Sequence, residues 1–145
     1  MFNDPENYLP HRAPFLFIDE YDVDAAGKRV TGSRTFTAED FFFKGHFPGN
    51  PIVPGVILVE TLAQCGGAGV SKAGVAPAGA IYVLAAMNKI KFRRIVKLGD
   101  KLDMEIKTVR VRKTFLTQKG KGFVNGELAV EAQWLSTFAE APRES

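Results

Sequence analysis

The chain has little of several features that mark special classes of protein. Its 145 residues include one cysteine, Cys65, so no disulfide can form within the chain, which agrees with a reducing compartment. No apolar run reaches the roughly 18 uncharged residues that a membrane-spanning helix needs. The most apolar window, residues 52–63, is interrupted by Pro54, Gly55 and Glu60. The first residues carry acids where a signal peptide has a basic end and an apolar core. We therefore expect a cytoplasmic protein without a membrane span.

The length is typical of one domain, so residues 1–145 are predicted to form a single domain. Its net charge is only +3, but residues 81–121 hold twelve Lys or Arg against three acids, which gives +9 there and −6 elsewhere. This asymmetry favours an acidic partner. A solvated strand face rich in lysine would give the same pattern. Nucleic acid is a poorer match, because the basic residues are not interleaved with aromatic stacking residues.

The first part of the chain predicts a hairpin followed by a short helix. Residues 8–18 begin with prolines that fix an extended backbone and continue as an apolar run, as expected for a buried first strand. Residues 29–37 predict a second strand that pairs with it. Thr37 is a candidate cap for a short helix that ends before Gly45.

A long helix is predicted to begin at Gly55, because Pro51 and Pro54 exclude a helix before it. Its residues before Ser71 are almost all apolar or small, so a surrounding sheet is expected to bury it nearly all round. Three glycines lower its helix propensity. Either the helix ends near the first of them, or another backbone approaches closely there; they are Gly66, Gly67 and Gly69.

The remaining sequence predicts about four antiparallel strands. Residues 81–96 form a long strand with one apolar and one basic face, and residues 101–109 alternate with Leu102, Met104 and Ile106 inward. Two further strands, 115–124 and 127–137, flank Asn125-Gly126, the strongest hairpin signal in the chain, and residues 139–145 are expected to be a frayed tail. The element order predicts an α+β fold in which an antiparallel sheet of about six strands wraps one long helix.

Two ionisable residues near the helix start are candidate catalytic groups. His46 lies in the rigid segment Gly45-His46-Phe47-Pro48-Gly49, and Glu60 lies on the apolar helix 14 residues later. An isolated histidine in such a loop is more often structural, but a carboxyl group on an apolar helix is costly unless it is paired or functional. Together they could exchange protons near pH 7.

Gly55 is the third informative position. A residue that opens a helix has an unpaired N–H, and the absence of a side chain lets a carbonyl oxygen approach it, as in an oxyanion hole. Pro-Gly before a helix is also ordinary turn chemistry.

Three segments together resemble the β-hydroxyacyl-acyl carrier protein dehydratases of bacterial fatty-acid synthesis, of the FabZ type. They are LPHRAPFLFID (9–19), GHFPGNPIVPGVILVETLAQ (45–64) and KIKFRRIVKLGDKL (89–102). The resemblance implies a hot-dog fold, a catalytic His46 and Glu60, a Gly55 N–H that holds the thioester carbonyl, and a supporting Gln64. It further implies homodimers, and possible trimers of dimers, in which His46 of one subunit faces Glu60 of the other.

The implied reaction eliminates water from a (3R)-hydroxyacyl thioester on acyl carrier protein to give the trans-2-enoyl product. It requires neither a cofactor nor a metal, and His11 is interpreted as a structural residue of the amino-terminal loop. Candidate residues of an acyl tunnel are Phe47, Ile52, Val53, Ile57 and Leu58, although most apolar residues there are simply core. A basic docking surface for the acidic carrier is predicted at Lys89, Lys91, Arg93, Arg94 and Lys97.

Three alternatives stay open at this point. The related FabA type also isomerises its product, but it carries aspartate in place of Glu60. Hot-dog acyl thioesterases use a carboxylate to activate water and lack the GHFPG histidine. A non-catalytic acyl-binding subunit would keep the fold without the reaction, and the presence of His46, Glu60 and Gly55 argues against it.

Overall fold

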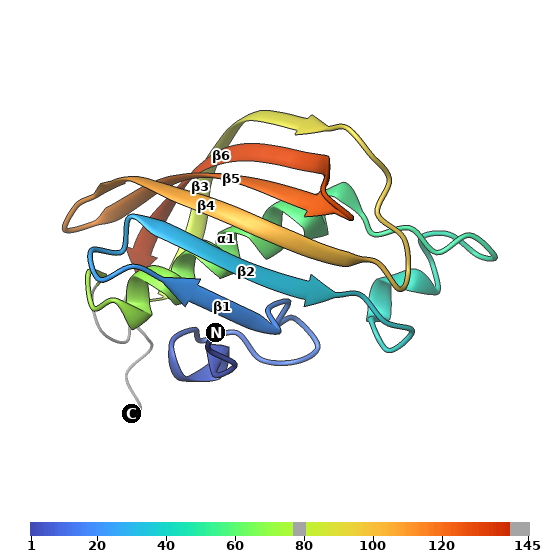
Figure 1. Ribbon diagram of the computed structural model, residues 1–145, viewed down its shortest axis with the longest axis horizontal. Coiled ribbons are helices and arrows are strands. Elements are labelled where there is room, and N and C mark those ends of the chain that lie inside the picture. The colour runs from blue at the N-terminus through green and yellow to red at the C-terminus, as the bar shows by residue number, and fades with distance from the viewer. Residues whose placement is uncertain (77–80, 140–145) are drawn as a thin grey trace.

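The computed structural model describes residues 1–76 and 81–139 of the chain. Most of the tail expected at 139–145 therefore lies outside the described residues. No helix within the described residues is long and apolar enough to cross a membrane. Figure 1 shows the elements, which follow one another as η1 (Pro5–Asn7), β1 (Glu20–Val23), β2 (Arg29–Thr35), η2 (Phe41–Phe43), α1 (Gly55–Lys72), β3 (Ile81–Phe92), β4 (Lys101–Val111), β5 (Phe115–Val124) and β6 (Glu127–Ala139).

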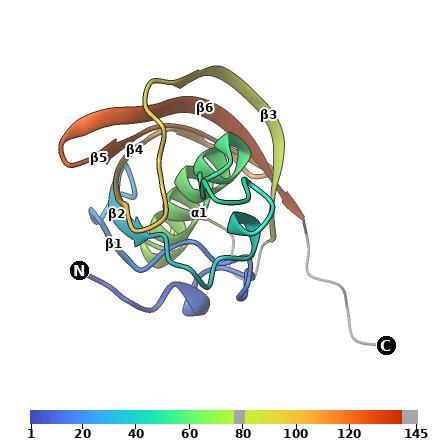
Figure 2. The same ribbon diagram turned by 90° about the vertical axis from the view of Figure 1, so that its right-hand side faces the viewer.

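One six-stranded sheet curls around α1. Its strand order is β1-β2-β4-β5-β6-β3, and each neighbouring pair is antiparallel. Seen end-on, the sheet encloses the helix on its concave side (Figure 2). Twelve of the eighteen helix residues are buried, so the core lies between α1 and the inner sheet face. The predicted α+β architecture is confirmed.

The clearest sequence patterns match the observed strands. Leu102, Met104 and Ile106 of β4 are buried, while the residues between them are exposed. Asn125 and Gly126 join β5 to β6 with φ angles of 50° and 80°. Positive φ at both positions is what a two-residue type I′ turn requires, and Asn-Gly supplies it at low cost.

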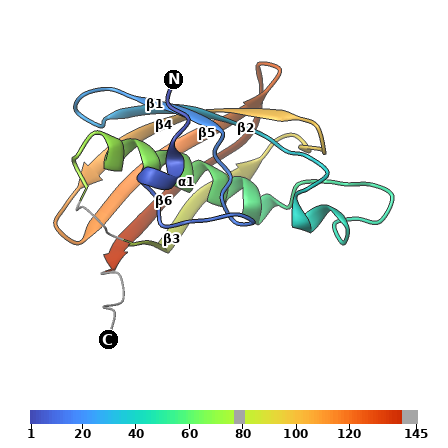
Figure 3. The same ribbon diagram turned by 90° about the horizontal axis from the view of Figure 1, so that it is seen from below.

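The prediction of a strand over residues 8–18 is wrong. This segment is irregular, and the first strand is β1, which pairs with β2. Figure 3 shows the amino-terminal segment crossing α1 on the side that the sheet leaves open. Leu9, Phe17 and Ile18 are buried there. An apolar run indicates burial but not a hydrogen-bonding partner, and here the segment covers a helix instead of extending a sheet.

β3 differs from its prediction in length and in faces. It ends at Phe92 instead of residue 96, and its pairing with β6 shifts register between Asn88 and Lys91. Lys89, within this irregularity, has a φ of 49°. The shift breaks the predicted alternation, and Phe92 is 54% exposed instead of buried.

The three helix glycines do not end α1, which continues to Lys72. The close approach comes from side chains, not from another backbone. A Cβ added at Gly66 would lie within 2.9 Å of three side-chain atoms of Gln118, and one at Gly69 would lie 2.4 and 2.5 Å from the two Cγ atoms of Val30. The glycines let the sheet pack directly against the helix.

We expect Gly69→Ala to destabilise the protein although alanine is the better helix former. The added methyl group would overlap a buried, β-branched side chain on β2, and such overpacking typically costs about 1–3 kcal/mol, against about 1 kcal/mol gained in propensity. Gly67→Ala is the matched control, because its nearest neighbour is the flexible end of Leu9 at 3.3 Å. Urea unfolding should give a lower midpoint for Gly69→Ala than for Gly67→Ala, and the opposite order would contradict the packing described here.

Candidate active site

His46 is held by its own loop. Its backbone N–H donates to the carbonyl oxygen of Phe42 at 3.0 Å, and its carbonyl oxygen accepts from the N–H of Ile52 at 2.9 Å. The side-chain Nδ1 lies 3.0 Å from the carbonyl oxygen of Ile52, and Phe47 stacks on the ring with centroids 4.0 Å apart. Because a carbonyl oxygen can only accept, the proton of the neutral ring sits on Nδ1. Nε2 then carries the free lone pair that a general base needs.

Gly55 and His46 line the same cavity. Its volume is about 490 Å³. The cavity lies at the start of α1, where Pro54 supplies no side-chain cap. Ile57 and Leu58 donate to the Pro54 carbonyl oxygen, but no hydrogen bond of the described residues engages the N–H of Gly55. A Cβ at position 55 would lie 2.8 Å from the ring of Phe92, so the packing of this ring is a structural reason for glycine here. Residues that could supply both ingredients of proton abstraction, an imidazole base and a helix-opening N–H, therefore line one cavity.

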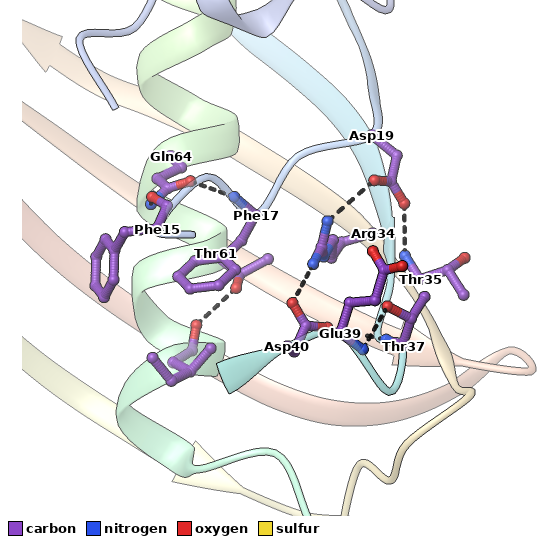
Figure 4. A network of polar contacts seen from close by, with 11 residues as sticks. Phe15, Phe17, Asp19, Arg34, Thr35, Thr37, Glu39, Asp40, Thr61 and Gln64 are labelled. Atoms are coloured by element: carbon purple, nitrogen blue, oxygen red, sulfur yellow. Dashed lines mark hydrogen bonds and ion pairs between the residues drawn. The ribbon is translucent and has the colours of Figure 1, made fainter. Parts of the chain in front are cut away.

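Glu60 is half-buried on α1, and one of its oxygens is held by neighbours. The side-chain amide of Gln64 donates to Glu60 Oε1 at 3.2 Å and to the carbonyl oxygen of Phe15 at 3.1 Å. The side-chain oxygen of Gln64 accepts from the backbone N–H of Phe17 at 2.8 Å (Figure 4). Gln64 thus connects the carboxyl group to the segment that covers the helix.

The structure does not bring His46 and Glu60 of one chain together. Among the hydrogen bonds and ion pairs of the described residues, none joins the two side chains. Gly55 lines the cavity, and Glu60 lies five residues further along α1. At about 100° per residue this is one full turn plus about 140°, so Glu60 points about 140° away from Gly55 around the helix axis. The carboxyl group consequently faces a different side of α1 from the cavity that contains His46.

His11 meets Glu60, which the sequence did not suggest. Its Nε2 lies 3.4 Å from Glu60 Oε1, and the two side chains are each 19% exposed. The sequence interpretation gave His11 a structural role in the amino-terminal loop. The two residues are 49 positions apart, and no local pattern connects them; only the position of the loop across α1 does.

An ion-pair network secures the segment that leads to His46. Arg34 on β2 contacts Asp19 at 3.2 Å and Asp40 at 2.5 Å, and Asp40 also accepts from the N–H of Thr37 at 2.9 Å (Figure 4). The predicted helix cap at Thr37 is misplaced, since the short helix is η2, which starts one residue after Asp40. The network attaches this turn to the sheet.

The predicted tunnel residues separate into three groups. Ile52, Val53 and Leu58 line the cavity of His46 and Gly55. Ile57 is buried in the core and does not line it, and Phe47 is 49% exposed beside the imidazole. The cavity wall thus comes from the Pro-rich loop and from the helix face of Gly55.

The predicted docking residues also divide. Arg93 and Arg94 line the cavity of His46 and pair with Glu131 at 3.3 Å and Glu127 at 2.6 Å. The two lysines of β3, Lys89 and Lys91, instead line a separate basic hollow of about 760 Å³, and Lys97 is exposed and lines neither space.

Across residues 1–76 and 81–139, no group of three His, Cys, Asp or Glu side chains is arranged to hold a metal ion.

A known domain family and several named proteins match most of this chain. The model of the FabA-like domain matches residues 9–133. The chain belongs to the FabA-like domain family. A protein of Desulforamulus reducens, called 3-hydroxyacyl-[acyl-carrier-protein] dehydratase FabZ, is 40% identical over 135 residues, which cover 93% of this chain and 94% of that protein. A Clostridium acetobutylicum protein of the same name is 42% identical over 125 residues, which cover 86% of this chain and 88% of that protein. The resemblance seen in the sequence is confirmed.

Solved structures confirm the hot-dog fold. The dehydratase heterocomplex ApeI:P from Xenorhabdus doucetiae matches with a TM-score of 0.82 at 17% identity, over 97% of this chain and 93% of that chain. A hypothetical thioesterase with coenzyme A from Streptococcus pneumoniae matches with 0.61 at 14% identity, over 87% and 91%. A dehydratase complex and a hypothetical thioesterase thus share this fold, and the site must distinguish the two reactions.

Proposed function

We propose that the protein is a (3R)-hydroxyacyl-[acyl carrier protein] dehydratase of fatty-acid biosynthesis, a hydro-lyase that releases water and a trans-2-enoyl thioester. Its relatives of this name align over most of both chains. The observation that carries the proposal is the His46 ring, which lines one cavity with Gly55 and whose Nδ1 is engaged by Ile52, while no hydrogen bond of the described residues engages Nε2. Abstraction of a proton next to a thioester carbonyl requires this combination of base and N–H donor.

The proposed reaction uses three groups in turn. His46 Nε2 takes the α-proton, and the Gly55 N–H, at the positive end of the helix dipole, stabilises the negative charge that develops on the thioester oxygen. Glu60, in its protonated form, then donates a proton to the β-hydroxyl as the C–O bond breaks. The electrons of the C–H bond form the new double bond, water leaves, and no electrons are exchanged with a cofactor.

We propose that the active site is completed by a second copy of the chain. His46 and Glu60 face different sides of α1 within one chain, so one copy alone does not supply both groups to one cavity. β3 is a twelve-residue strand at the edge of the sheet and exposes Val83, Met87 and Phe92. A long edge strand with several exposed apolar side chains favours pairing with another strand. A homodimer that pairs β3 with its copy would protect the edge, and dimers could gather further into hexamers.

The function is tested by supplying 3-hydroxyacyl carrier protein and following its products. A dehydratase converts it to the enoyl thioester, whereas a thioesterase releases the free carrier thiol. We expect enoyl product with no thiol release above background. Free thiol as the main product would replace the proposal by the thioesterase alternative. Binding of the acyl group without either product would leave the acyl-binding alternative.

We expect the two arginines at the cavity to matter more for carrier binding than the lysines of β3. Arg93→Gln with Arg94→Gln should raise the KM for carrier-bound substrate by about tenfold and leave the KM of a small thioester unchanged, because only the acidic carrier is attracted by their charge. Charge reversal to glutamate should be stronger, but it also sets like charges against Glu131 and Glu127.

Lys89→Gln with Lys91→Gln is the matched comparison, since these residues face the other hollow. An unchanged KM in the arginine variant would refute docking at the cavity, and a larger effect from the lysine pair would move the docking surface to the outer face of the sheet.

A cytoplasmic location stays a prediction of the sequence.

A further inference from the structure

Glu60 presents its two oxygens to very different surroundings. Oε1 accepts from the Gln64 amide at 3.2 Å and lies 3.4 Å from His11 Nε2. No hydrogen bond or ion pair of the described residues engages Oε2. Because an NH₂ group only donates, the acidic proton of the neutral carboxyl group belongs on Oε2. One oxygen is held while the other is free for the substrate.

The ring of His11 has one nitrogen at Glu60 and one without a partner. Its Nδ1 is buried and forms no hydrogen bond within the described part of the chain. A proton on Nδ1 would leave a buried donor unsatisfied and turn the lone pair of Nε2 toward a carboxyl oxygen. The neutral ring therefore carries its proton on Nε2, facing Glu60. This is the opposite tautomer from that of His46.

The loop that carries His11 is fixed on both sides. On the amino-terminal side, the Arg12 side chain donates to the carbonyl oxygen of Leu9 at 2.8 Å and to that of His11 itself at 2.7 Å. After it, the backbone of Phe15 and Phe17 is held by Gln64, the same residue that binds Glu60. Two groups thus approach Glu60 Oε1: the His11 imidazole from the amino-terminal segment, and the Gln64 amide from α1.

We propose that His11 is a positioning residue for Glu60, which orients the carboxyl group so that Oε2 delivers the proton to the departing hydroxyl. This inference rests on the proposed dehydratase function. The contact of 3.4 Å is longer than a normal hydrogen bond, as is common at catalytic groups before substrate binds. Small errors in the position of a reacting group cost about tenfold to 100-fold in rate.

The kinetic test compares His11→Ala with His11→Gln, whose amide keeps a donor near the position of Nε2. We expect His11→Ala to lower kcat about tenfold or more with little change in KM, and His11→Gln to recover most of the rate. In a Glu60→Gln background, His11→Ala should cause no further loss, because the role operates through Glu60. Wild-type kcat in His11→Ala, equal losses in both His11 variants, or additive losses in the double variant would overturn the inference.

An NMR measurement separates failure of this inference from failure of the proposed function. The chain has only two histidines, so the ring nitrogens of His11 are assigned by their persistence in His46→Ala. We expect the ¹⁵N shift of His11 Nε2 to change in Glu60→Gln, and to do so whether or not the protein is a dehydratase. An unchanged shift would overturn the contact with Glu60. Absence of enoyl product from the wild type, with the shift change present, would instead reject only the proposed function.

Discussion

His46→Ala is expected to lower the rate of enoyl formation by on the order of 10²-fold or more, which is the usual contribution of a positioned general base. Its loop is held by backbone hydrogen bonds on both sides, so removal of the imidazole should leave the fold intact. The loss should appear mainly in kcat, because the other residues that line the cavity, among them Ile52, Val53 and Leu58, are unchanged. Conversion of 3-hydroxyacyl carrier protein by the purified variant measures it.

Glu60→Gln tests the acid of the same reaction. The amide has nearly the shape of the carboxyl group but cannot donate the proton that the hydroxyl needs, so we again expect a loss on the order of 10²-fold. Glu105→Gln is the control, since Glu105 is exposed on β4 and lines the separate basic hollow. Full activity in His46→Ala or Glu60→Gln would refute the assignment of that residue.

Arg34→Met is expected to destabilise the fold by about 3–5 kcal/mol, because removal of one partner of a buried ion pair leaves an uncompensated charge. The Asp40 side chain is only 7% exposed and lies 2.5 Å from the Arg34 guanidinium group. The same guanidinium group lies over the rings of Phe17 and Phe36 at 5.7 and 5.6 Å, so packing is lost as well.

Arg93→Met is the matched control for stability. Its pair with Glu131 has side-chain exposures of 46% and 26%, and exposed pairs contribute about 0–1 kcal/mol. Chemical denaturation of both variants should separate them by several kilocalories per mole. If Arg34→Met cost no more than Arg93→Met, the network of Figure 4 would not be what secures the turn before His46.

Local sequence patterns predicted those elements whose burial is decided locally. The alternation of β4, the Asn125-Gly126 turn and the start of α1 after Pro54 each follow from backbone chemistry or from a two-residue period. His46, Glu60 and Gly55 were found as candidates because an ionisable group on an apolar helix and a bare helix start are visible in sequence. Their roles are proposals that the experiments above test.

Features that depend on tertiary neighbours were not predictable in this way. Residues 8–18 are apolar because they cover α1, and the same pattern would fit a buried strand. The faces of β3 were misjudged because its position at the sheet edge and its register shift cannot be read from a period. The contact of His11 with Glu60 joins positions 49 residues apart, and it exists only once the loop lies on the helix.

Combining two inactive variants tests most directly whether one site is built from His46 of one subunit and Glu60 of its partner. His46→Ala and Glu60→Gln subunits, refolded together in equal amounts, should give about half heterodimers, each with one intact and one doubly altered site. Co-purification through a tag on one variant shows that the subunits have exchanged. The shared site predicts recovery of about a quarter of the wild-type rate. Exchanged subunits with no recovered activity would contradict it.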